Sequence, residues 1–269
     1  EENYQKAVDL GIGRKVKAQD IWSKIIESQV ETGVPYLCAK DSANKKTNHQ
    51  NIGVIKQSNL CNEIYQYTDE ETTAICTLSS IVLKNFIVDG KFDYKLLIEE
   101  VRRAVKALNN VIDKNNYSTE KGLKGGLEQR AIAIGTQGLA DVFYLMDYIF
   151  TSEEAKVLNK NIFEAIYFAA ITESNDLCKR GVREPYKFFK GSPMSKGVFQ
   201  FDMWGLNESE LFLDWDTLKT EVKEYGVCNS LFTAQMPVAS SAKITGSFEM
   251  TEPAHSALFN RRVVGGEIM

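Results

Sequence analysis

The chain has 269 residues, of which 43% are hydrophobic and 25% charged, with a formal net charge of −4. This length can bury a sizeable core, and the composition is typical of a soluble globular protein. Because the basic residues are scattered and no apolar run reaches the length of a membrane span, the sequence predicts neither direct nucleic-acid binding nor a membrane segment, and we expect a cytoplasmic location.

The first predicted element is an amphipathic helix over residues 18–31. Its apolar side chains recur at helical spacing, and Gly33 and Pro35 end it. Residues 36–58 are polar and predict a long loop. Loops of this length inside a compact domain are typically functional or disordered. Residues 74–83 predict a buried strand or turn that runs into a short helix.

A second amphipathic helix is predicted over residues 92–113, with one continuous apolar face. The glycines at 122–126 predict a break in regular structure. Residues 130–134 then predict a short buried strand. The chain passes from this strand through a tight turn at 135–138 into a helix over 139–148.

The next predicted helix begins with a capping-box pattern, Thr151 followed by Glu154, and runs to about Cys178. Another short helix is predicted over 216–225, and a strand-like segment over 231–239 follows it. Strands that alternate with helices around buried apolar runs predict an α/β fold. The pattern alone does not decide between a barrel and an open sheet.

Five cysteines are present, without a CxxC pair, and the chain has only two histidines. The sequence therefore predicts no metal site and no secreted disulfide framework. Cysteines in this context are usually buried small residues or catalytic thiols. They are Cys38, Cys61, Cys76, Cys178 and Cys228.

The first candidate for chemistry is the segment Asn59–Glu63. If it is extended, the side chains of Asn59, Cys61 and Glu63 point to the same side. An amide could then hold a substrate hydroxyl, a carboxylate could take its proton, and a thiol could react with the substrate. From these residues alone, a buried structural cysteine beside a surface glutamate is the simpler explanation.

Two further segments carry candidate residues. The apolar neighbours of Cys76 predict a buried position, which a small core residue would also explain. The segment Met236–Ser241 reads as a short strand that ends in small hydroxyl residues. Its backbone N–H groups and hydroxyls could hold a phosphate, although an ordinary turn has the same composition.

The segment Ser58–Ile64 resembles the active-site loop motif of ribonucleotide reductase large subunits of the class I type. Further stretches resemble the same family in the same order and extend the resemblance over nearly the whole chain. They are Glu27–Tyr36, Gln50–Gly53, Ala74–Leu83, Gly135–Asp141, Met236–Ser241 and Asn260–Val263.

This resemblance implies a ten-stranded α/β barrel with the active-site loop inserted through its centre, and residues 1–269 would be part of that catalytic barrel domain. It implies the reduction of ribonucleoside diphosphates to deoxyribonucleoside diphosphates for DNA synthesis. The family's nucleotide-effector region, its radical-pathway tyrosines and its tail cysteines have no counterpart in these residues. We therefore expect the chain to be inactive alone, and to need the missing portions of the large subunit.

The resemblance also implies a role for each site residue. Cys61 would be the thiyl radical that removes the 3′ hydrogen of the ribose, Glu63 the base for the 3′ hydroxyl, and Asn59 a hydrogen-bonding partner of the substrate hydroxyls. Cys76 would be one of two thiols that deliver the reducing electrons and end as a disulfide. The residues expected to contact the substrate are Asn59, Leu60, Cys61, Asn62, Glu63, Pro237, Val238, Ala239, Ser240 and Ser241.

No cofactor or metal is expected on this chain itself. The resemblance implies a small subunit that contains a metal and generates the radical, and thioredoxin or glutaredoxin as the reductant. The alternatives are a cobalamin-dependent reductase, a structural or assembly piece of a split reductase that does no chemistry alone, and an unrelated α/β thiol enzyme. A depressed Cys61 pKa and alkylation without nucleotide would favour the last of these.

Overall fold

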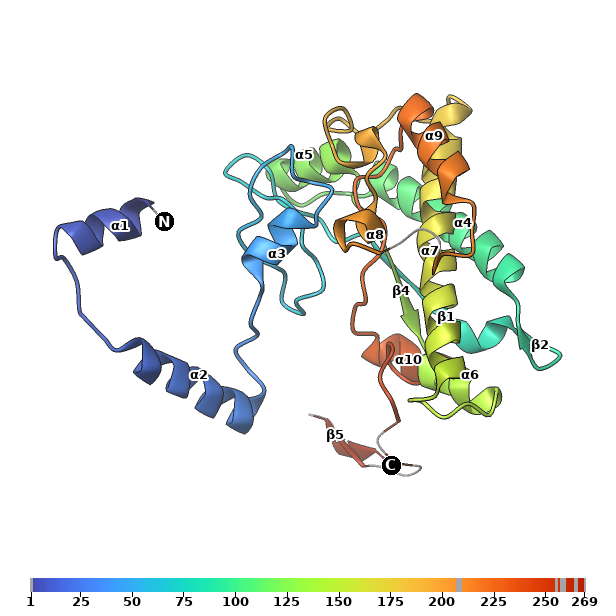
Figure 1. The fold of residues 1–269 in the computed structure, drawn as a ribbon, viewed down its shortest axis with the longest axis horizontal. Helices are drawn as coiled ribbons and strands as arrows, with labels where there is room; N and C mark the ends of the chain where they lie inside the picture. Colours follow the sequence, from blue (N-terminus) through green and yellow to red (C-terminus); the bar gives the residue numbers. More distant parts are fainter. Residues whose placement is uncertain (1, 207–209, 255, 257–259, 264–265, 269) are drawn as a thin grey trace. The chain divides into compact units, whose positions relative to one another are not determined.

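The computed structural model describes residues 2–206, 210–254, 256, 260–263 and 266–268. The chain divides into two compact units (Figure 1). Unit 1 is Glu1–Ala39, and unit 2 is Lys40–Met269.

Unit 1 consists of helices α1 (Glu2–Asp9) and α2 (Ala18–Thr32), so the helix predicted over 18–31 is confirmed. It ends at Gly33, whose φ of 77° lies in the left-handed region and whose N–H donates to the Gln29 carbonyl. The apolar face that predicted this helix is not buried within unit 1. The amphipathic pattern therefore located the helix correctly without indicating what covers it.

Two parallel strands lie at the centre of unit 2. They are β1 (Leu78–Val82) and β4 (Ala133–Gln137), with Leu78 opposite Ala133. Successive backbone N–H groups of a strand point to opposite edges, and the N–H groups of Ile132 and Ile134 donate to Leu231 and Phe232. The segment that follows Ser230 therefore runs along the edge of β4 opposite β1. This confirms its predicted extended character, although only a single parallel bridge, Ile134 to Thr233, forms there.

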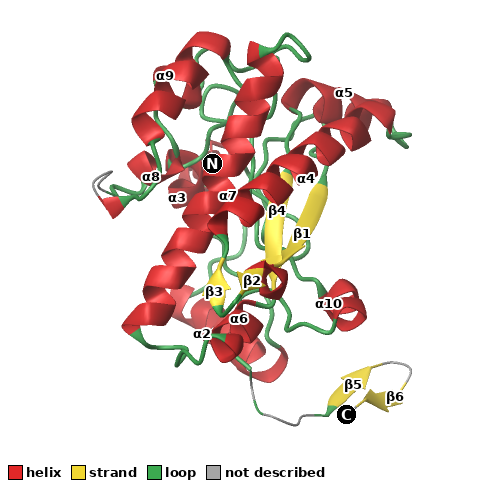
Figure 2. Ribbon diagram, turned by 90° about the vertical axis from the view of Figure 1, so that its right-hand side faces the viewer, coloured by secondary structure: helices red, strands yellow, loops and turns green. Residues whose placement is uncertain are grey.

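Two long helices cover this sheet in successive layers. Helix α4 (Tyr94–Lys114) packs on β1 and β4, and α7 (Glu153–Lys179) packs on α4, as Figures 1 and 2 both show. Asp93 begins α4 by accepting a hydrogen bond from the Leu96 N–H at 2.9 Å. The layers share one hydrophobic core, to which α4 contributes Val101 and α7 contributes Ile166, both fully buried.

The remaining elements of unit 2 are short. They are α3 (Lys40–Lys45), η1 (Leu83–Phe86), β2 (Ile87–Val88), β3 (Lys91–Phe92), α5 (Glu120–Gln129), α6 (Leu139–Leu145), η2 (Met194–Lys196), α8 (Gln200–Met203), α9 (Trp215–Tyr225), α10 (Ala239–Thr245), β5 (Arg261–Val263) and β6 (Gly266–Ile268). The helix predicted over 216–225 is thus confirmed as α9. The strand that runs into a short helix, predicted over 74–83, is confirmed as β1 followed by η1, but its predicted burial is wrong, because only Ile81 of β1 is buried. The predicted loop over 36–58 is interrupted by α3.

The predicted break at the glycines 122–126 is wrong, because these residues lie inside helix α5. Thr119 begins the helix by accepting a hydrogen bond from the Gly122 N–H at 3.1 Å. A β-carbon on Gly125 would collide with the backbone of Thr73, and one on Gly126 would collide with the Tyr117 ring. The glycines therefore allow close packing here, and this requirement outweighs their low helix propensity.

Two predicted boundaries also require correction. Strand β4 begins three residues later than the predicted 130–134, so Gly135–Gln137 belong to the strand, and only Gly138, with φ 81°, forms the turn into α6. The cap of α7 is Ser152, which accepts from the Ala155 N–H at 3.2 Å, and the predicted capping box at Thr151 is not formed. Both errors shift an element without changing its type.

The described residues are α/β in architecture and form no closed barrel. Within this same part of the chain, no helix combines the length and apolar character needed to cross a bilayer.

Candidate active site

The loop Ser58–Ile64, called the cysteine loop below, is folded back as a turn. The Asn62 N–H donates to the Asn59 carbonyl at 3.2 Å, and Asn62 has a φ of 64°. The segment is therefore not extended, and the strand alternation considered for it does not govern where these side chains point. Cys61 instead lies at the exposed tip of the turn, beside an almost fully exposed Leu60.

Two side chains at the start of the cysteine loop bind the backbone at its end and hold the turn closed. The Asn59 side-chain oxygen accepts from the Ile64 N–H at 3.0 Å. The Ser58 hydroxyl donates to the Ile64 carbonyl at 2.7 Å. Asn59 therefore has a structural task in the loop, which its sequence pattern did not reveal.

Glu63 and Cys61 both act electrostatically on Cys76. Partial desolvation of the Cys76 thiol raises its pKa, and the charges of Glu63 and Cys61 raise it further. Glu63 also keeps one carboxylate oxygen, Oε2, shielded from solvent with no hydrogen-bond partner in the described structure. Such an acceptor is costly to leave unpaired, and it is available to a hydroxyl donor.

The predicted burial of Cys76 is wrong, because this residue is exposed. Side chains alternate along the extended chain that enters β1, and the neighbouring Thr77 takes the buried side. The apolar neighbours of Cys76 therefore indicated a strand correctly, but Cys76 lies on the face of it that also carries the half-exposed Leu78.

The segment Pro237–Ser241, called the serine turn below, begins helix α10. As predicted, an extended stretch ends in small hydroxyl residues at a helix start, with Ala239 the first helical residue. Ser240 and Ser241 are exposed, and the Ser241 hydroxyl donates to the Val238 carbonyl at 3.3 Å. The first backbone N–H groups of a helix have no partner within the helix.

A small apolar cluster brings the cysteine loop and the serine turn together. Its buried members come from β4, from the residue before the serine turn, from the serine turn itself and from α10, and Ile64 of the cysteine loop packs against them. The buried members are Ala133, Met236, Val238 and Ala242. Ile64 follows Cys61 by three residues, so the structure joins two segments that are separated by more than 170 positions in the sequence.

The stretch Gly135–Asp141 supports the serine turn from both sides. Before the turn, the Thr136 hydroxyl donates to Gln235 Oε1 at 2.8 Å. After it, the Asp141 carboxylate accepts from the Phe248 N–H at 2.7 Å. The sequence predicted only a strand-to-helix turn for this stretch, because contacts to residues 100 positions away leave no local signal.

His49 anchors the base of the cysteine loop, a role that the sequence did not indicate. Its Nδ1 accepts from the Tyr67 N–H at 3.2 Å, so the ring proton resides on Nε2, which donates to the Ser230 hydroxyl at 2.8 Å. Complete burial lowers the pKa of His49 to about 4. The imidazole is therefore neutral near pH 7 and serves as a fixed bridge between two loops.

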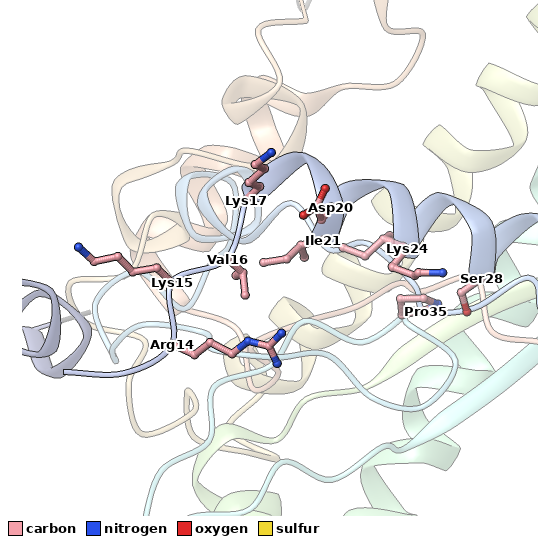
Figure 3. A pocket seen from close by; sticks show the side chains of 10 residues that line it. Arg14, Lys15, Val16, Lys17, Asp20, Ile21, Lys24, Ser28 and Pro35 are labelled. Atoms are coloured by element: carbon pink, nitrogen blue, oxygen red, sulfur yellow. The ribbon is translucent and has the colours of Figure 1, made fainter. Parts of the chain in front are cut away.

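Unit 1 carries a shallow groove that lies apart from these residues in the sequence (Figure 3). Basic and apolar side chains of α2 and of the segment before it line the groove, among them Arg14, Lys17 and Ile21. None of the predicted site residues contributes to it. Among the residues that the structure describes, no group of three or more His, Cys, Asp or Glu side chains could hold a metal ion.

Comparison with known proteins gives a consistent result over the whole chain. The family model for the ribonucleotide reductase barrel domain matches residues 1–269. The large subunit of ribonucleoside-diphosphate reductase from Caenorhabditis elegans is 44% identical over 257 residues, which cover 95% of this chain and 32% of that protein.

Two other relatives have the same name and similar coverage. The Monkeypox virus large subunit is 46% identical over 253 residues, covering 94% of this chain and 32% of its own length. The Trypanosoma brucei brucei large subunit is 45% identical over 266 residues, with the same two coverages. The chain thus spans about a third of the length of the curated relatives that it matches.

Proposed function

The chain belongs to the ribonucleotide reductase family, within the barrel domain of the large subunit, and from this membership we propose that it is part of the catalytic subunit of a ribonucleoside-diphosphate reductase. The reaction is the conversion of ribonucleoside diphosphates to deoxyribonucleoside diphosphates. The support for this reaction is that the relatives are named as large subunits of ribonucleoside-diphosphate reductase.

One structural observation supports the proposal at the level of the site. Ile64 of the cysteine loop packs on the cluster that contains Val238 of the serine turn. A ribose at Cys61 could therefore have its diphosphate at Ser240 and Ser241. Reaction at a sugar carbon requires both ends of the nucleotide to be held together, because orientation supplies much of the rate enhancement.

The proposed first step takes place at the 3′ position of the ribose. Cys61, as a thiyl radical, removes the 3′ hydrogen atom and becomes a thiol, which leaves the unpaired electron on C3′. The unpartnered Glu63 Oε2 accepts the proton of the 3′ hydroxyl, and Asn59 holds the substrate hydroxyls. The 2′ hydroxyl then takes up the proton that Glu63 had accepted and leaves as water.

The proposed reducing step uses Cys76. Two thiols, Cys76 and a second one, together supply two electrons and two protons to the sugar and end as a disulfide. The hydrogen atom on Cys61 then returns to C3′, which restores the thiyl radical. The influence of the Glu63 and Cys61 charges on the pKa of Cys76 supports a position for this thiol beside the reacting groups.

Substrate contacts are proposed for the two loops. In the cysteine loop, Leu60 and Asn62 flank Cys61 and complete the surface that faces the ribose. In the serine turn, backbone N–H groups and hydroxyls bind the diphosphate. The proposed residues of that turn are Pro237, Val238, Ala239, Ser240 and Ser241.

We further propose that residues 1–269 all belong to one ten-stranded α/β barrel. In this barrel β1, β4 and the extended segment 231–234 would be neighbouring strands. The parallel pairing of β1 with β4 supports this arrangement. In such a barrel the exposed Cys61 and Cys76 would face an interior completed by other portions of the large subunit. We propose that these other portions of the large subunit are required for activity.

The proposed partners follow from the name "large subunit" of the relatives. A small subunit would supply the oxidising equivalent that converts the Cys61 thiol to a thiyl radical. Thioredoxin or glutaredoxin would reduce the disulfide that Cys76 forms in each turnover. We propose that the protein acts in the cytoplasm, where such reductants operate.

A reconstitution experiment tests the proposal. The natural protein that contains this chain is combined with a radical-generating small subunit, thioredoxin, thioredoxin reductase and NADPH, and the formation of dCDP from CDP is measured. We expect turnover that is lost in Cys61→Ser. Turnover that needs added cobalamin and no small subunit would instead assign the cobalamin-dependent class, and absence of turnover under both conditions would contradict the proposed function.

A further inference from the structure

A second pair of thiols lies outside the candidate active site, at the C-terminal end of α7. Cys228 is completely buried, and Cys178, in the last helical turn, is partly exposed. The interaction between the two thiols is the largest cause of both pKa shifts, since it raises the pKa of Cys178 and lowers that of Cys228.

Helix geometry supports the closeness of these thiols independently. Ser174 lies four residues before Cys178 on α7, so the two side chains share one face of the helix. The Ser174 hydroxyl lies 3.4 Å from Cys228 Sγ. The face of α7 that carries Cys178 is therefore the face against which Cys228 packs.

The surroundings of Cys228 are electropositive. The charges of Arg130 and Arg183 both lower the pKa of its thiol. Each of these guanidinium groups has a buried Nε atom without a hydrogen-bond partner in the described structure. Reactive cysteines are found where cationic groups stabilise a thiolate and solvent reaches at least one sulfur, and this pair meets both conditions.

We propose that Cys178 and Cys228 form an oxidisable dithiol that closes to a disulfide with hydrogen peroxide as the oxidant, separately from Cys61 and Cys76. Neither cysteine has a part in the reduction of ribose described above. The proposal rests on the contacts around α7, so it does not depend on the proposed function.

The chemistry balances for one peroxide per pair. Cys228, whose thiol has the lowered pKa, loses its proton to solvent. The proton of Cys178 then moves to the Cys228 sulfur, which leaves the accessible Cys178 as the thiolate. Attack on peroxide breaks the O–O bond, and the released hydroxide takes up the lost proton, giving a sulfenic acid and one water. The Cys228 sulfur then attacks the Cys178 sulfur, an S–S bond replaces the S–O bond, and a second water leaves.

Closure would fix a segment that supports the cysteine loop. The residues directly after Cys228 are Asn229, whose side-chain N–H donates to the Arg130 carbonyl at 2.8 Å, and Ser230, whose hydroxyl accepts from His49 at 2.8 Å. The disulfide thus ties the end of α7 to the segment on which His49 rests.

Peptide mapping tests the proposal. In the natural protein with Cys61→Ser and Cys76→Ser, which removes the other proposed redox thiol and the radical thiol, hydrogen peroxide is added in steps, and remaining thiols are blocked with N-ethylmaleimide. Proteolysis and mass spectrometry then identify cross-linked peptides. We expect a linked peptide with Cys178 and Cys228 whose mass is two hydrogens below the sum of its parts, and which dithiothreitol separates.

The control is Cys178→Ser, a nearly isosteric change at the partly exposed position, whose fold is checked by circular dichroism. In this variant the linked peptide should disappear, and Cys228 should be recovered with N-ethylmaleimide attached after unfolding. Recovery of both cysteines as separate thiols or sulfonic acids in the parent protein, or linkage of either cysteine to Cys38 instead, would overturn the proposal.

Discussion

Gly135 on β4 lies directly beneath Met236, the residue that leads into the serine turn. A β-carbon at position 135 would meet the Met236 sulfur and would lie 2.7 Å from the Ala234 carbonyl oxygen. The approach of these two backbone segments therefore requires a glycine. This close contact places the serine turn on β4, beside the cysteine loop.

Gly135→Ala is expected to destabilise unit 2 and to displace the serine turn. Overpacking a close contact of this kind costs about 1–3 kcal/mol in the free energy of unfolding. Urea denaturation measures the loss. If the clash with Met236 is the cause, Gly135→Ala combined with Met236→Ala should lose less stability than the sum of the single variants. Strict additivity would contradict the explanation.

The buried His49 predicts a specific loss of stability in mild acid. Its folded-state pKa of about 4 lies below the ordinary value of 6.5, so the unfolded chain binds the proton more tightly. The neutral, buried His49 therefore makes a pH-dependent contribution of about 3 kcal/mol to the free energy of unfolding. This contribution is fully present above pH 6.5 and is lost as the pH falls towards 4. His49→Gln should flatten the unfolding free energy over this range. An unchanged pH profile in the variant would refute the assignment.

Cys76→Ser is expected to separate the two halves of the proposed reaction. In the proposed reaction, hydrogen abstraction by Cys61 needs no electron from Cys76, whereas net reduction does. The variant should therefore fail to produce dCDP over many turnovers in the reconstituted enzyme with thioredoxin. Multiple turnover at the rate of the parent enzyme would remove Cys76 from the redox pair.

Ser240→Ala and Ser241→Ala are expected to weaken the binding of the diphosphate. Loss of a hydrogen bond to a charged group costs about 1.5–3 kcal/mol, which corresponds to roughly a tenfold or greater increase in the Kd of CDP. Equilibrium binding measures the effect, with cytidine as the control ligand because it has no diphosphate. Equal weakening of cytidine and CDP, or an effect on kcat alone, would contradict the phosphate role.

The sequence predicted the long helices α2, α4 and α7 well, and α2 and α4 each have an amphipathic local pattern. It failed where contacts distant in sequence decide the structure. The glycines of α5 were mistaken for a break because the close neighbour of Gly125, Thr73, is about 50 positions away. The exposure of Cys76 depends on which face of a strand the helices cover, and residue order does not report this.

The candidate site shows the same division. The Cys61 motif was recognisable from the sequence, but its conformation was not, because the hydrogen bond from Asn62 to Asn59 makes a turn out of a segment that alternation would make extended. His49 was missed altogether. Its importance arises from partners at Tyr67 and Ser230, and a lone histidine in a polar stretch gives no sign of either.

The central claim, that Cys61 removes the 3′ hydrogen of the substrate, is tested most directly with CDP that carries deuterium at C3′. The reconstituted Cys76→Ser variant is mixed with CDP, and the rate of substrate radical formation in a single turnover is followed by electron paramagnetic resonance. Deuterium at C3′ should lower this rate. The Cys61→Ser variant should give no substrate radical from either isotopic form while still binding CDP. Formation of the same radical in Cys61→Ser would show that another group performs the abstraction and would contradict the account.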